Sequence, residues 1–276
     1  MKFKASVIIS VYDNTRLLKP VLDSLKQQTE KNFEIIISED GQSEEMKTFV
    51  ADYPFVNDFQ HLTQEDNGWQ KNKALNNAIR HATSDWLIFI DGDCVLHPRF
   101  VEMHLRFAGE KSILAGKRVK LDPKTSVFLE NNMPETIAQM QKIFTKKLFF
   151  GKGKTGFIEE SIFISPDGLL GFIPGLRKAN RLIGSNMSFS KKAIYAINGF
   201  DEEYTLPAVG EDTDLAWRFK AAGYELKPVR NLAVQYHLYH KEIWTDKSVN
   251  LARMQKNQSQ NRYICTCGLN QPENEL

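Results

Sequence analysis

The segment DWLIFIDGDC, residues 85–94, is an apolar run that stops at two aspartates held one glycine apart. A short apolar run rich in β-branched and aromatic residues and ended by turn residues predicts a strand buried on both faces. Two earlier segments repeat the pattern, ASVIISVY at 5–12 and FEIIISED at 33–40. The chain therefore carries several buried strands that each end in polar residues.

Helical patterns separate these strands. Leucines and valines recur at helical spacing over residues 17–25, Ser43 precedes two glutamates as a helix start does, and GWQKNKALNNAIRHA at 68–82 predicts a third helix after a strand at 59–63. Alternating strands and helices predict an α/β fold with a mostly parallel central sheet flanked by helices.

Composition limits the classes of function. The 276 residues are 42% hydrophobic, which suits one domain, and 36 basic against 34 acidic residues leave a net charge of +2, so we expect no nucleic-acid partner. Three cysteines indicate a reducing compartment rather than a disulfide framework. Asp13 interrupts the first apolar run too early for a signal peptide, and no run reaches the roughly 18 apolar residues of a membrane span. We therefore expect a cytoplasmic protein.

The regular pattern of residues 1–115 fades after Lys117 and returns at 184–256. The later region predicts helices at 191–200 and 210–224 and one strand at 227–242, and the polar tail 257–276 is expected to be loosely held. Residues 116–183, called the insert below, predict helices and loops packed on the domain. A second interpretation is peripheral contact of 145–177 with anionic lipid at the inner face of the plasma membrane or with a lipid-linked substrate, because apolar and cationic side chains alternate there: Phe149, Phe150, Phe157, Leu169, Leu170, Phe172 and Ile173 with Lys146, Lys147, Lys152, Lys154 and Arg177.

Polar side chains gather at the carboxyl ends of the predicted strands, where ligands of parallel sheets bind: Tyr12, Asp13, Glu39, Asp40, Asp91 and Asp93. The Asp91-Gly92-Asp93 triplet alone is compatible with a turn, but two carboxylates at a buried strand end also suit Mg²⁺ or Mn²⁺. A histidine at 237 or 240 is a candidate further ligand.

A second acidic cluster, GEDTD at 210–214, begins a predicted helix. The helix dipole favours acids there, but three acids in four positions exceed what capping requires. An ionised carboxylate near a substrate hydroxyl is a general base. Together with a metal, this cluster indicates transfer to a hydroxyl from a donor whose leaving group is a phosphate.

Several ordered motifs carry a family resemblance. SVIISVYDN, IIISEDGQSE, DNGWQKNKALNNAI and IFIDGDC resemble the pattern of family-2 glycosyltransferases with the GT-A fold. RLIGSNMSFSKKAIYAINGFDEEY and GEDTDLAWRFKAAGY resemble the acceptor half of the β-1,4-galactosyltransferase and chondroitin-polymerase group. The resemblance covers 4–115 and 181–242. It implies a single Rossmann-like GT-A domain with a nucleotide-sugar-binding half at 1–115 and an acceptor-binding, catalytic half at 184–256.

The resemblance also implies a role for each matching residue. The nucleobase pocket would involve Val11, Tyr12 and Glu39, and the segment past the base and diphosphate would supply Asp66, Asn67, Gly68 and Lys71. Asp91 and Gly92 would face the ribose and the metal, and the metal ligands would be Asp93, His237 and Asp91. Asp212 would be the catalytic base, and Glu211 would hold the acceptor. The group has a tryptophan and glycines where this chain has residues 206–210, LPAVG, so acceptor and donor preference do not transfer.

The implied function is a metal-dependent, inverting hexosyltransferase that uses Mn²⁺ or Mg²⁺. It would move a sugar from a UDP-hexose or UDP-N-acetylhexosamine to a hydroxyl of a glycan or lipid-linked glycan, in the synthesis of capsule, O-antigen or another surface polysaccharide. Two alternatives stay open: a Mg²⁺-dependent phosphotransferase or phosphatase, and a catalytically silent glycan-assembly subunit of the same fold.

Overall fold

The main sheet has seven strands in the order β3-β2-β1-β4-β8-β6-β9. The computed structural model describes residues 3–132, 136–150, 155–241 and 245–270. All neighbouring strands are parallel except β8, which is antiparallel to both β4 and β6. The predicted mostly parallel α/β sheet is thereby confirmed. The strand bounds are β1 Ala5–Val11, β2 Phe33–Glu39, β3 Phe59–Leu62, β4 Trp86–Asp91, β6 Ser112–Ala115, β8 Met187–Ser190 and β9 Glu225–Pro228.

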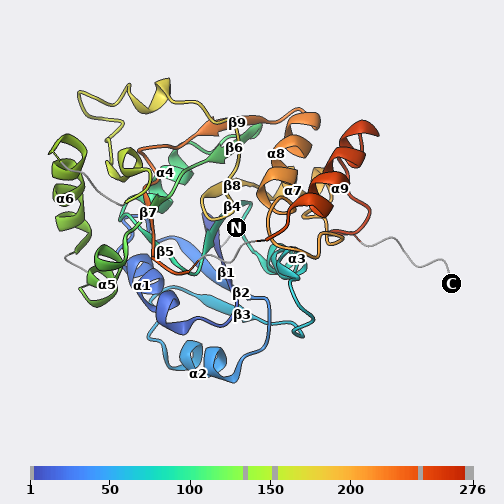
Figure 1. Cartoon of the computed structure of the whole chain (residues 1–276), viewed down its shortest axis with the longest axis horizontal. Helices are drawn as coiled ribbons and strands as arrows, with labels where there is room; N and C mark the ends of the chain where they lie inside the picture. The colour runs from blue at the N-terminus through green and yellow to red at the C-terminus, as the bar shows by residue number, and fades with distance from the viewer. Residues whose placement is uncertain (1–2, 133–135, 151–154, 242–244, 271–276) are drawn as a thin grey trace.

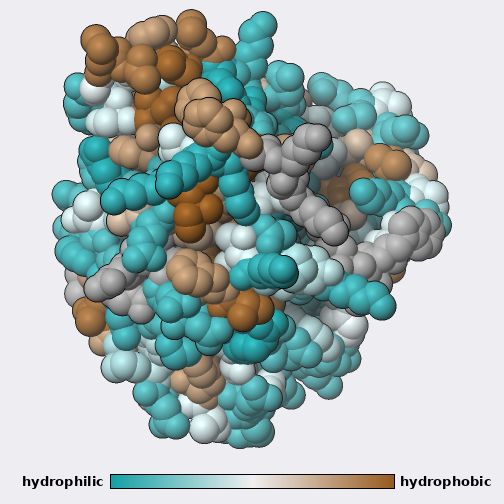
Figure 2. All heavy atoms as spheres, turned by 60° about the vertical axis from the view of Figure 1, so that its left-hand side comes forward, coloured by the Kyte–Doolittle hydropathy of each residue, from teal (hydrophilic) through white to brown (hydrophobic). Residues whose placement is uncertain are grey.

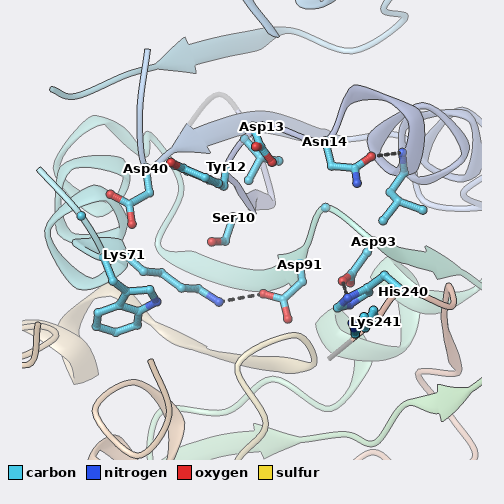
Figure 3. Close-up of a pocket in the computed structure, with 15 residues that line it drawn as sticks. Ser10, Tyr12, Asp13, Asn14, Asp40, Lys71, Asp91, Asp93, His240 and Lys241 are labelled. Atoms are coloured by element: carbon cyan, nitrogen blue, oxygen red, sulfur yellow. Dashed lines mark hydrogen bonds and ion pairs between the residues drawn. The ribbon is translucent and has the colours of Figure 1, made fainter. Parts of the chain in front are cut away.

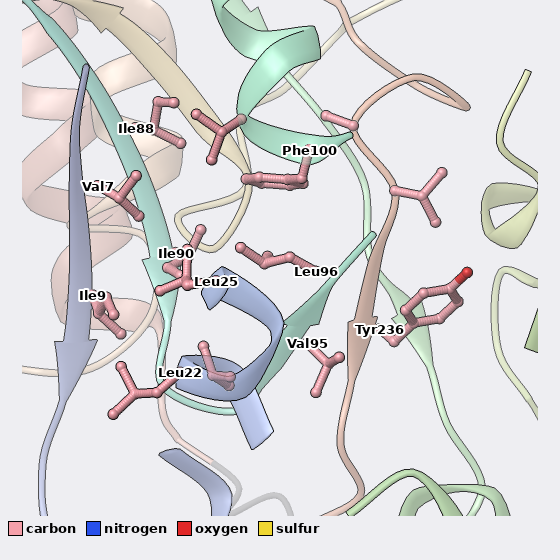
Figure 4. Packing of buried hydrophobic residues seen from close by; sticks show 14 of the residues in the cluster. Val7, Ile9, Leu22, Leu25, Ile88, Ile90, Val95, Leu96, Phe100 and Tyr236 are labelled. Atoms are coloured by element: carbon pink, nitrogen blue, oxygen red, sulfur yellow. The ribbon is translucent and has the colours of Figure 1, made fainter. Parts of the chain in front are cut away.

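Helices cover both faces of this sheet (Figure 1). Alternate residues of β1 face opposite ways, so Val7 and Ile9 join one core cluster and Ile8 joins the other. The first cluster includes residues of α1 Thr15–Lys26, α2 Glu44–Asp52 and α4 Phe100–Arg106. Figure 4 shows this packing, with Leu22 and Leu25 of α1 against the strands. The second cluster is covered by α3 Lys71–His81, α7 Lys191–Ala196 and α8 Asp212–Ala221.

A small second sheet has the order β5-β10-β7, formed by Cys94–Leu96, Gln235–His237 and Val119–Lys120. Strand β5 follows the Asp91-Gly92-Asp93 turn directly, and β10 pairs with it in antiparallel register, with His237 opposite Cys94. This pairing brings the end of the chain's second half to the end of β4.

The insert forms helices and loops, as predicted. It contains α5 Pro123–Asn131, α6 Thr136–Phe150 and the 3₁₀ turns η1 Ile158–Ser161 and η2 Pro174–Leu176. Asp122 caps α5 by accepting from the amide of Thr125. Lys152 and Lys154 lie outside the described residues. Within the described ranges, no helix combines the length and apolar character needed to cross a bilayer.

Two expectations from the sequence are wrong. Residues 227–242 do not form one strand: β9 ends at Pro228, Asn231 adopts a left-handed φ of 61°, and β10 begins only at Gln235, in the other sheet. Proline cannot continue the ladder because it lacks an N–H donor. The tail is also not loose over its described part, since α9 Ser248–Ser259 runs into it and both Cys265 and Leu269 are buried.

Candidate active site

The carboxyl ends of β1, β2 and β4 open into a cavity of about 700 Å³. The strand registers bring this about, because Val11 lies beside Glu39 and Ser10 lies beside Asp91, so all three strands end at one edge. The cavity, called the rim cavity below, is shown in Figure 3. Its lining residues are Ser10, Val11, Tyr12, Asp13, Asn14, Leu17, Asp40, Gly68, Trp69, Lys71, Asp91, Gly92, Asp93, His240 and Lys241.

Gly92 separates the two aspartates because the turn passes very close to β1. A Cβ on Gly92 would lie 2.7 Å from Cγ1 of Val11, and the Gly92 amide donates to the carbonyl of Ser10 at 2.9 Å. The glycine is therefore required for a close approach of two backbones. This approach fixes Asp91 and Asp93 on the wall of the cavity.

Asp93, His237 and His240 form a group able to hold a metal ion. Oδ2 of Asp93 lies 3.3 Å from Nε2 of His237 and 3.0 Å from Nε2 of His240. The two imidazole nitrogens are 3.3 Å apart, so the three ligand atoms converge on one point. A carboxylate with two imidazoles fits Mn²⁺ and leaves coordination positions for a substrate. The sequence left open whether His237 or His240 is the further ligand. The structure places both histidines beside Asp93.

The electrostatics of Asp93 suit a metal ligand. Burial alone would raise the pKa of Asp93, but hydrogen bonds with His237 and His240 outweigh burial and hold the pKa well below its usual range. Its neighbour Cys94 is a poor ligand, because burial and then the charge of Asp93 raise the pKa of the thiol well above its ordinary value.

Lys71 connects the two acidic clusters. Its ammonium lies 2.8 Å from Oδ1 of Asp91 and 2.9 Å from Oε1 of Glu211. Burial opposes the charged form of Lys71, but both carboxylates raise its pKa. Arg118 lies 3.3 Å from the other oxygen of Asp91. Lys71, expected near a diphosphate, thus holds Asp91 and Glu211 together.

Glu211 and Asp212 lie at the start of α8, where Lys71 links Glu211 to Asp91. Burial raises the pKa of Glu211 to about 7, with Asp91 and Asp212 adding to the effect and Lys71 opposing it. The backbone leaves room for Glu211 because residue 184 is glycine, where a Cβ would lie 1.9 Å from Oε1 of Glu211. The third acid, Asp214, is buried and binds Arg218, so it stabilises the helix.

Glu39 and Asp40 were both expected at the strand ends, with Glu39 in the nucleobase pocket, but of the two only Asp40 lines the rim cavity. The carboxylate of Glu39 is fully buried, where it pairs with His61 Nε2 at 2.6 Å and accepts from the amide of Ser43 at 2.7 Å. Asp40 lines the rim cavity instead. Strand alternation explains this, because adjacent residues point to opposite faces.

The segment 66–68 contributes in a different way from that expected. Asp66 accepts a hydrogen bond from Tyr12 Oη at 2.8 Å, and Asn67 donates to Glu65. Of residues 66–68, Gly68 alone lines the rim cavity. Sequence reasoning missed Trp69, which lines the cavity beside Gly68. The aromatic residue within the quoted GWQ motif was a usable signal.

Three cavities follow one another across the site. The rim cavity shares Asp91, Asp93 and His240 with a second one of about 980 Å³, the histidine cavity, which also contains His237. The histidine cavity shares Arg118, Lys120, Ala208 and Lys247 with a third of about 460 Å³, the acid cavity, which contains Glu211 and Asp212. A ligand at the metal group can therefore reach the α8 acids.

This arrangement defines a class of protein: a GT-A-like α/β domain with a nucleotide-sized cavity, a metal-binding group and carboxylates beyond it. The model for Glycosyl transferase family 2 matches residues 6–163, more than half of the chain, and the model for the N-terminal domain of galactosyltransferase matches 176–241. The chain belongs to glycosyltransferase family 2. The phosphatase alternative is thereby set aside.

Two of the curated relatives are polysaccharide synthases longer than this chain. Chondroitin synthase of Escherichia coli is 26% identical over 247 residues, which cover 84% of this chain and 34% of that protein. Hyaluronan synthase of Pasteurella multocida is 24% identical over 258 residues, 86% of this chain and 24% of that protein. The chain thus spans about a third or less of these relatives.

Solved structures share the fold. S. aureus TarS 1-349 in complex with UDP-GlcNAc superposes with a TM-score of 0.58 at 14% identity, covering 97% of this chain and 68% of that one. The mannosyltransferase PcManGT from Pyrobaculum calidifontis, in complex with GDP-Man and Mn²⁺, gives 0.54 at 14% identity, covering 95% and 63%. At this identity the similarity concerns the GT-A fold.

Proposed function

We propose that this chain is a metal-dependent, inverting hexosyltransferase that uses a UDP-sugar and extends a surface polysaccharide. The observation that carries the proposal is the convergence of Asp93, His237 and His240 between the rim cavity and the α8 acids. The rim cavity has the size of a nucleotide-sugar site. The synthase relatives support a polysaccharide product.

Each of these residues has a separate role in a single displacement reaction. Tyr12 and Asp40, which line the rim cavity, would face the nucleoside, and Asp93 with both histidines would hold Mn²⁺, which would supply a Lewis acid for the departing diphosphate. Asp212 takes the proton from the acceptor hydroxyl, the acceptor oxygen attacks the anomeric carbon, and the bond to the diphosphate breaks. Glu211, held by Lys71, positions the acceptor.

The test is a donor screen. Purified protein is incubated with a panel of nucleotide sugars and MnCl₂, MgCl₂ or EDTA, and thermal shift and release of nucleoside diphosphate are measured. We expect one UDP-sugar to stabilise the protein only with metal. Asp93→Ala should abolish that dependence, whereas Asp85→Ala, an exposed change at the other end of the same strand region, should not.

Two outcomes contradict the proposal differently. Absence of metal-dependent nucleotide binding in the unaltered protein overturns the site assignment. Tight UDP-sugar binding with neither hydrolysis nor transfer to any acceptor supports the silent-subunit alternative.

We also propose that the insert rests on an anionic membrane at the cytoplasmic face. Phe150 and Leu169 are 91% and 95% exposed, and Phe149, Phe172 and Leu176 are exposed as well. Figure 2 shows hydrophobic side chains gathered along the top of the molecule, the height at which the loop before η2 runs in Figure 1. The exposed Lys146 of α6 supplies charge complementary to anionic lipid, whereas Lys147 pairs with Asp122.

Flotation with vesicles tests this surface. We expect the protein to bind phosphatidylglycerol vesicles better than phosphatidylcholine vesicles. Phe150→Ser combined with Leu169→Ser should reduce binding at least about tenfold, because each apolar side chain contributes roughly 1.5–3 kcal/mol when buried. Val56→Ser, which changes an exposed residue outside the insert, is the control. Equal binding by both variants contradicts the membrane proposal.

A further inference from the structure

The acid cavity continues into a smaller cavity lined by cations. This basic cavity, of about 150 Å³, shares Lys117 and Arg181 with the acid cavity, and Lys178 and Arg230 also line it. Its volume is well below that of an ordinary ligand pocket, so it suits one small group of a larger ligand. It lies at the end of the path that begins at the rim cavity.

Within the part of the chain that the structure describes, most of these cations have no acidic partner at ion-pair distance. Arg230 binds Glu160, which also binds Arg177. Among the described residues, no carboxylate lies at ion-pair distance from Lys117, Lys178 or Arg181. Burial and then repulsion from Arg181 and Arg230 lower the pKa of Lys117, against weaker attraction from Glu160 and Asp212. Cations held together without acids form a site for an anion.

Position separates these cations from those near the donor. Arg118, Lys120 and Lys247 line both the histidine cavity and the acid cavity, so they are within reach of a diphosphate at the metal group. Of these four cavities, Lys117 and Arg181 line the acid and basic cavities and neither of the other two. Their ligand is therefore a group of the molecule that occupies the acid cavity beside Asp212.

We propose that Lys117 and Arg181 bind an anionic group of the acceptor and select acidic over neutral acceptors. This inference rests on the proposed function, because it takes the acid cavity as the acceptor site. A carboxylate of a hexuronic acid and a phosphate ester offer the same chemistry, two or more negatively charged oxygens that accept charge-assisted hydrogen bonds.

The test compares three tetrasaccharides that differ only at C6 of the non-reducing sugar: glucuronic acid, glucose 6-phosphate and glucose. Binding is measured calorimetrically with UDP and MnCl₂ present. We expect the two acidic acceptors to bind at least about tenfold more tightly than the neutral one, because hydrogen bonds to charged groups contribute most. Which acidic acceptor binds more tightly identifies the source of the anion. Raised salt should reduce the difference.

Variants assign the effect to the two residues. Lys117→Ala with Arg181→Ala should weaken the acidic acceptors to the level of the neutral one. Lys73→Ala with Arg262→Ala, which removes an exposed lysine and arginine elsewhere, should change nothing. Arg181→Ala alone serves if the double variant does not fold, since Arg181 is exposed.

Equal affinity of the unaltered protein for all three acceptors, or an unchanged preference in the variants, overturns the inference. UDP binding in the same samples keeps the two proposals apart. Absence of UDP binding in the unaltered protein counts against the proposed function. UDP binding without a preference for acidic acceptors counts only against the anion site.

Discussion

At the scale of single residues, Asp212 and Glu211 are adjacent but lie in different surroundings. Glu211 is bound by Lys71, whereas Asp212 has its Oδ2 3.4 Å from the amide of Gly184 and lines the acid cavity. We expect Asp212→Asn to lower transfer by roughly 10²–10⁴-fold, the usual contribution of a general base. UDP affinity should stay near that of the unaltered protein. Transfer assays with radiolabelled donor and UDP titrations measure the two effects.

Glu211→Gln is the matched comparison for that prediction. The Lys71 ammonium binds two carboxylates, Glu211 and Asp91, and this variant removes the first of them. It should therefore alter metal-dependent UDP affinity as well as transfer. Full transfer activity in Asp212→Asn would contradict the assignment of the base.

His104 should make the stability of the protein depend on pH. It is fully buried, with Nδ1 2.8 Å from Ser188 Oγ and Nε2 3.1 Å from Asn186 Oδ1. Burial lowers the pKa of His104 to about 3. In the unfolded chain a histidine has a pKa near 6.5, so below that pH the unfolded state binds a proton that the folded state does not. The contribution of neutral His104 to the unfolding free energy is therefore fully present above pH 6.5 and is lost as the pH falls toward 3.

Urea unfolding of the unaltered protein and of His104→Gln at pH 7.5 and 5.0 tests this dependence. Between the two pH values the unaltered protein should lose about 2 kcal/mol more of its unfolding free energy than the variant does. His97, whose pKa burial lowers to about 4, titrates in both proteins and cancels from the difference. Equal losses would show that His104 is not the responsible group.

Residue types predicted the site better than they predicted side-chain direction. The Asp91-Gly92-Asp93 turn and the α8 acids were recognisable because their chemistry and strand-end or helix-start positions coincide. Glu39 and Asp40 were not distinguishable, since adjacent side chains at a strand end face opposite ways and residue type does not show which of the two carboxylates faces the cavity.

At the scale of elements, the loop before α8 carries strain. Ala208 and Val209 have φ of 70° and 68°, in the left-handed region that favours glycine. Asn250 of α9 holds this loop by donating to the carbonyls of Leu206 and Ala208. The loop borders the acid and histidine cavities, so strained backbone lies beside the candidate site.

Ala208→Gly should relieve part of that strain. A left-handed alanine costs roughly 1–2 kcal/mol, and the greater freedom of glycine in the unfolded chain offsets about half of the gain. We expect stabilisation of up to about 1 kcal/mol, measured as the shift of the urea midpoint. Ala222→Gly, at the end of α8 with a φ of −81°, should be neutral or destabilising. A destabilised Ala208→Gly would argue against strain at this position.

Elements with strong periodicity were predictable, and those fixed by long-range contacts were not. β1, β2 and β4 were read correctly because a buried parallel strand is apolar throughout. The division of 227–242 between two sheets depends on Asn231. Its side-chain amide donates to the carbonyls of Glu159 and Ile162 in the insert. No local sequence pattern predicts such a long-range contact.

At the scale of the whole molecule, the C-terminal segment closes the second core cluster. Arg80 of α3 donates to the carbonyls of Gly268 and Leu269, and Asn198 after α7 donates to those of Cys265 and Asn270. The segment thus joins a helix of the donor half to a helix of the acceptor half. Its low apolar content concealed this role, because backbone carbonyls, which the sequence pattern does not reveal, make these hydrogen bonds.

Leu269 tests whether this closure matters for the fold. Its side chain is 6% exposed and packs in the second cluster, and a Cβ on Gly199 would lie 2.6 Å from its Cγ. We expect Leu269→Ala to lower the unfolding free energy by about 2–3 kcal/mol, the low end for buried leucines, because Leu269 lies outside helices and strands, where the backbone relaxes readily. Leu251→Ala, at a residue of α9 that is 38% exposed, should change the unfolding free energy by less than about 0.5 kcal/mol. Urea denaturation measures both, and equal small effects would mean that the segment packs against a fold that is already complete without it.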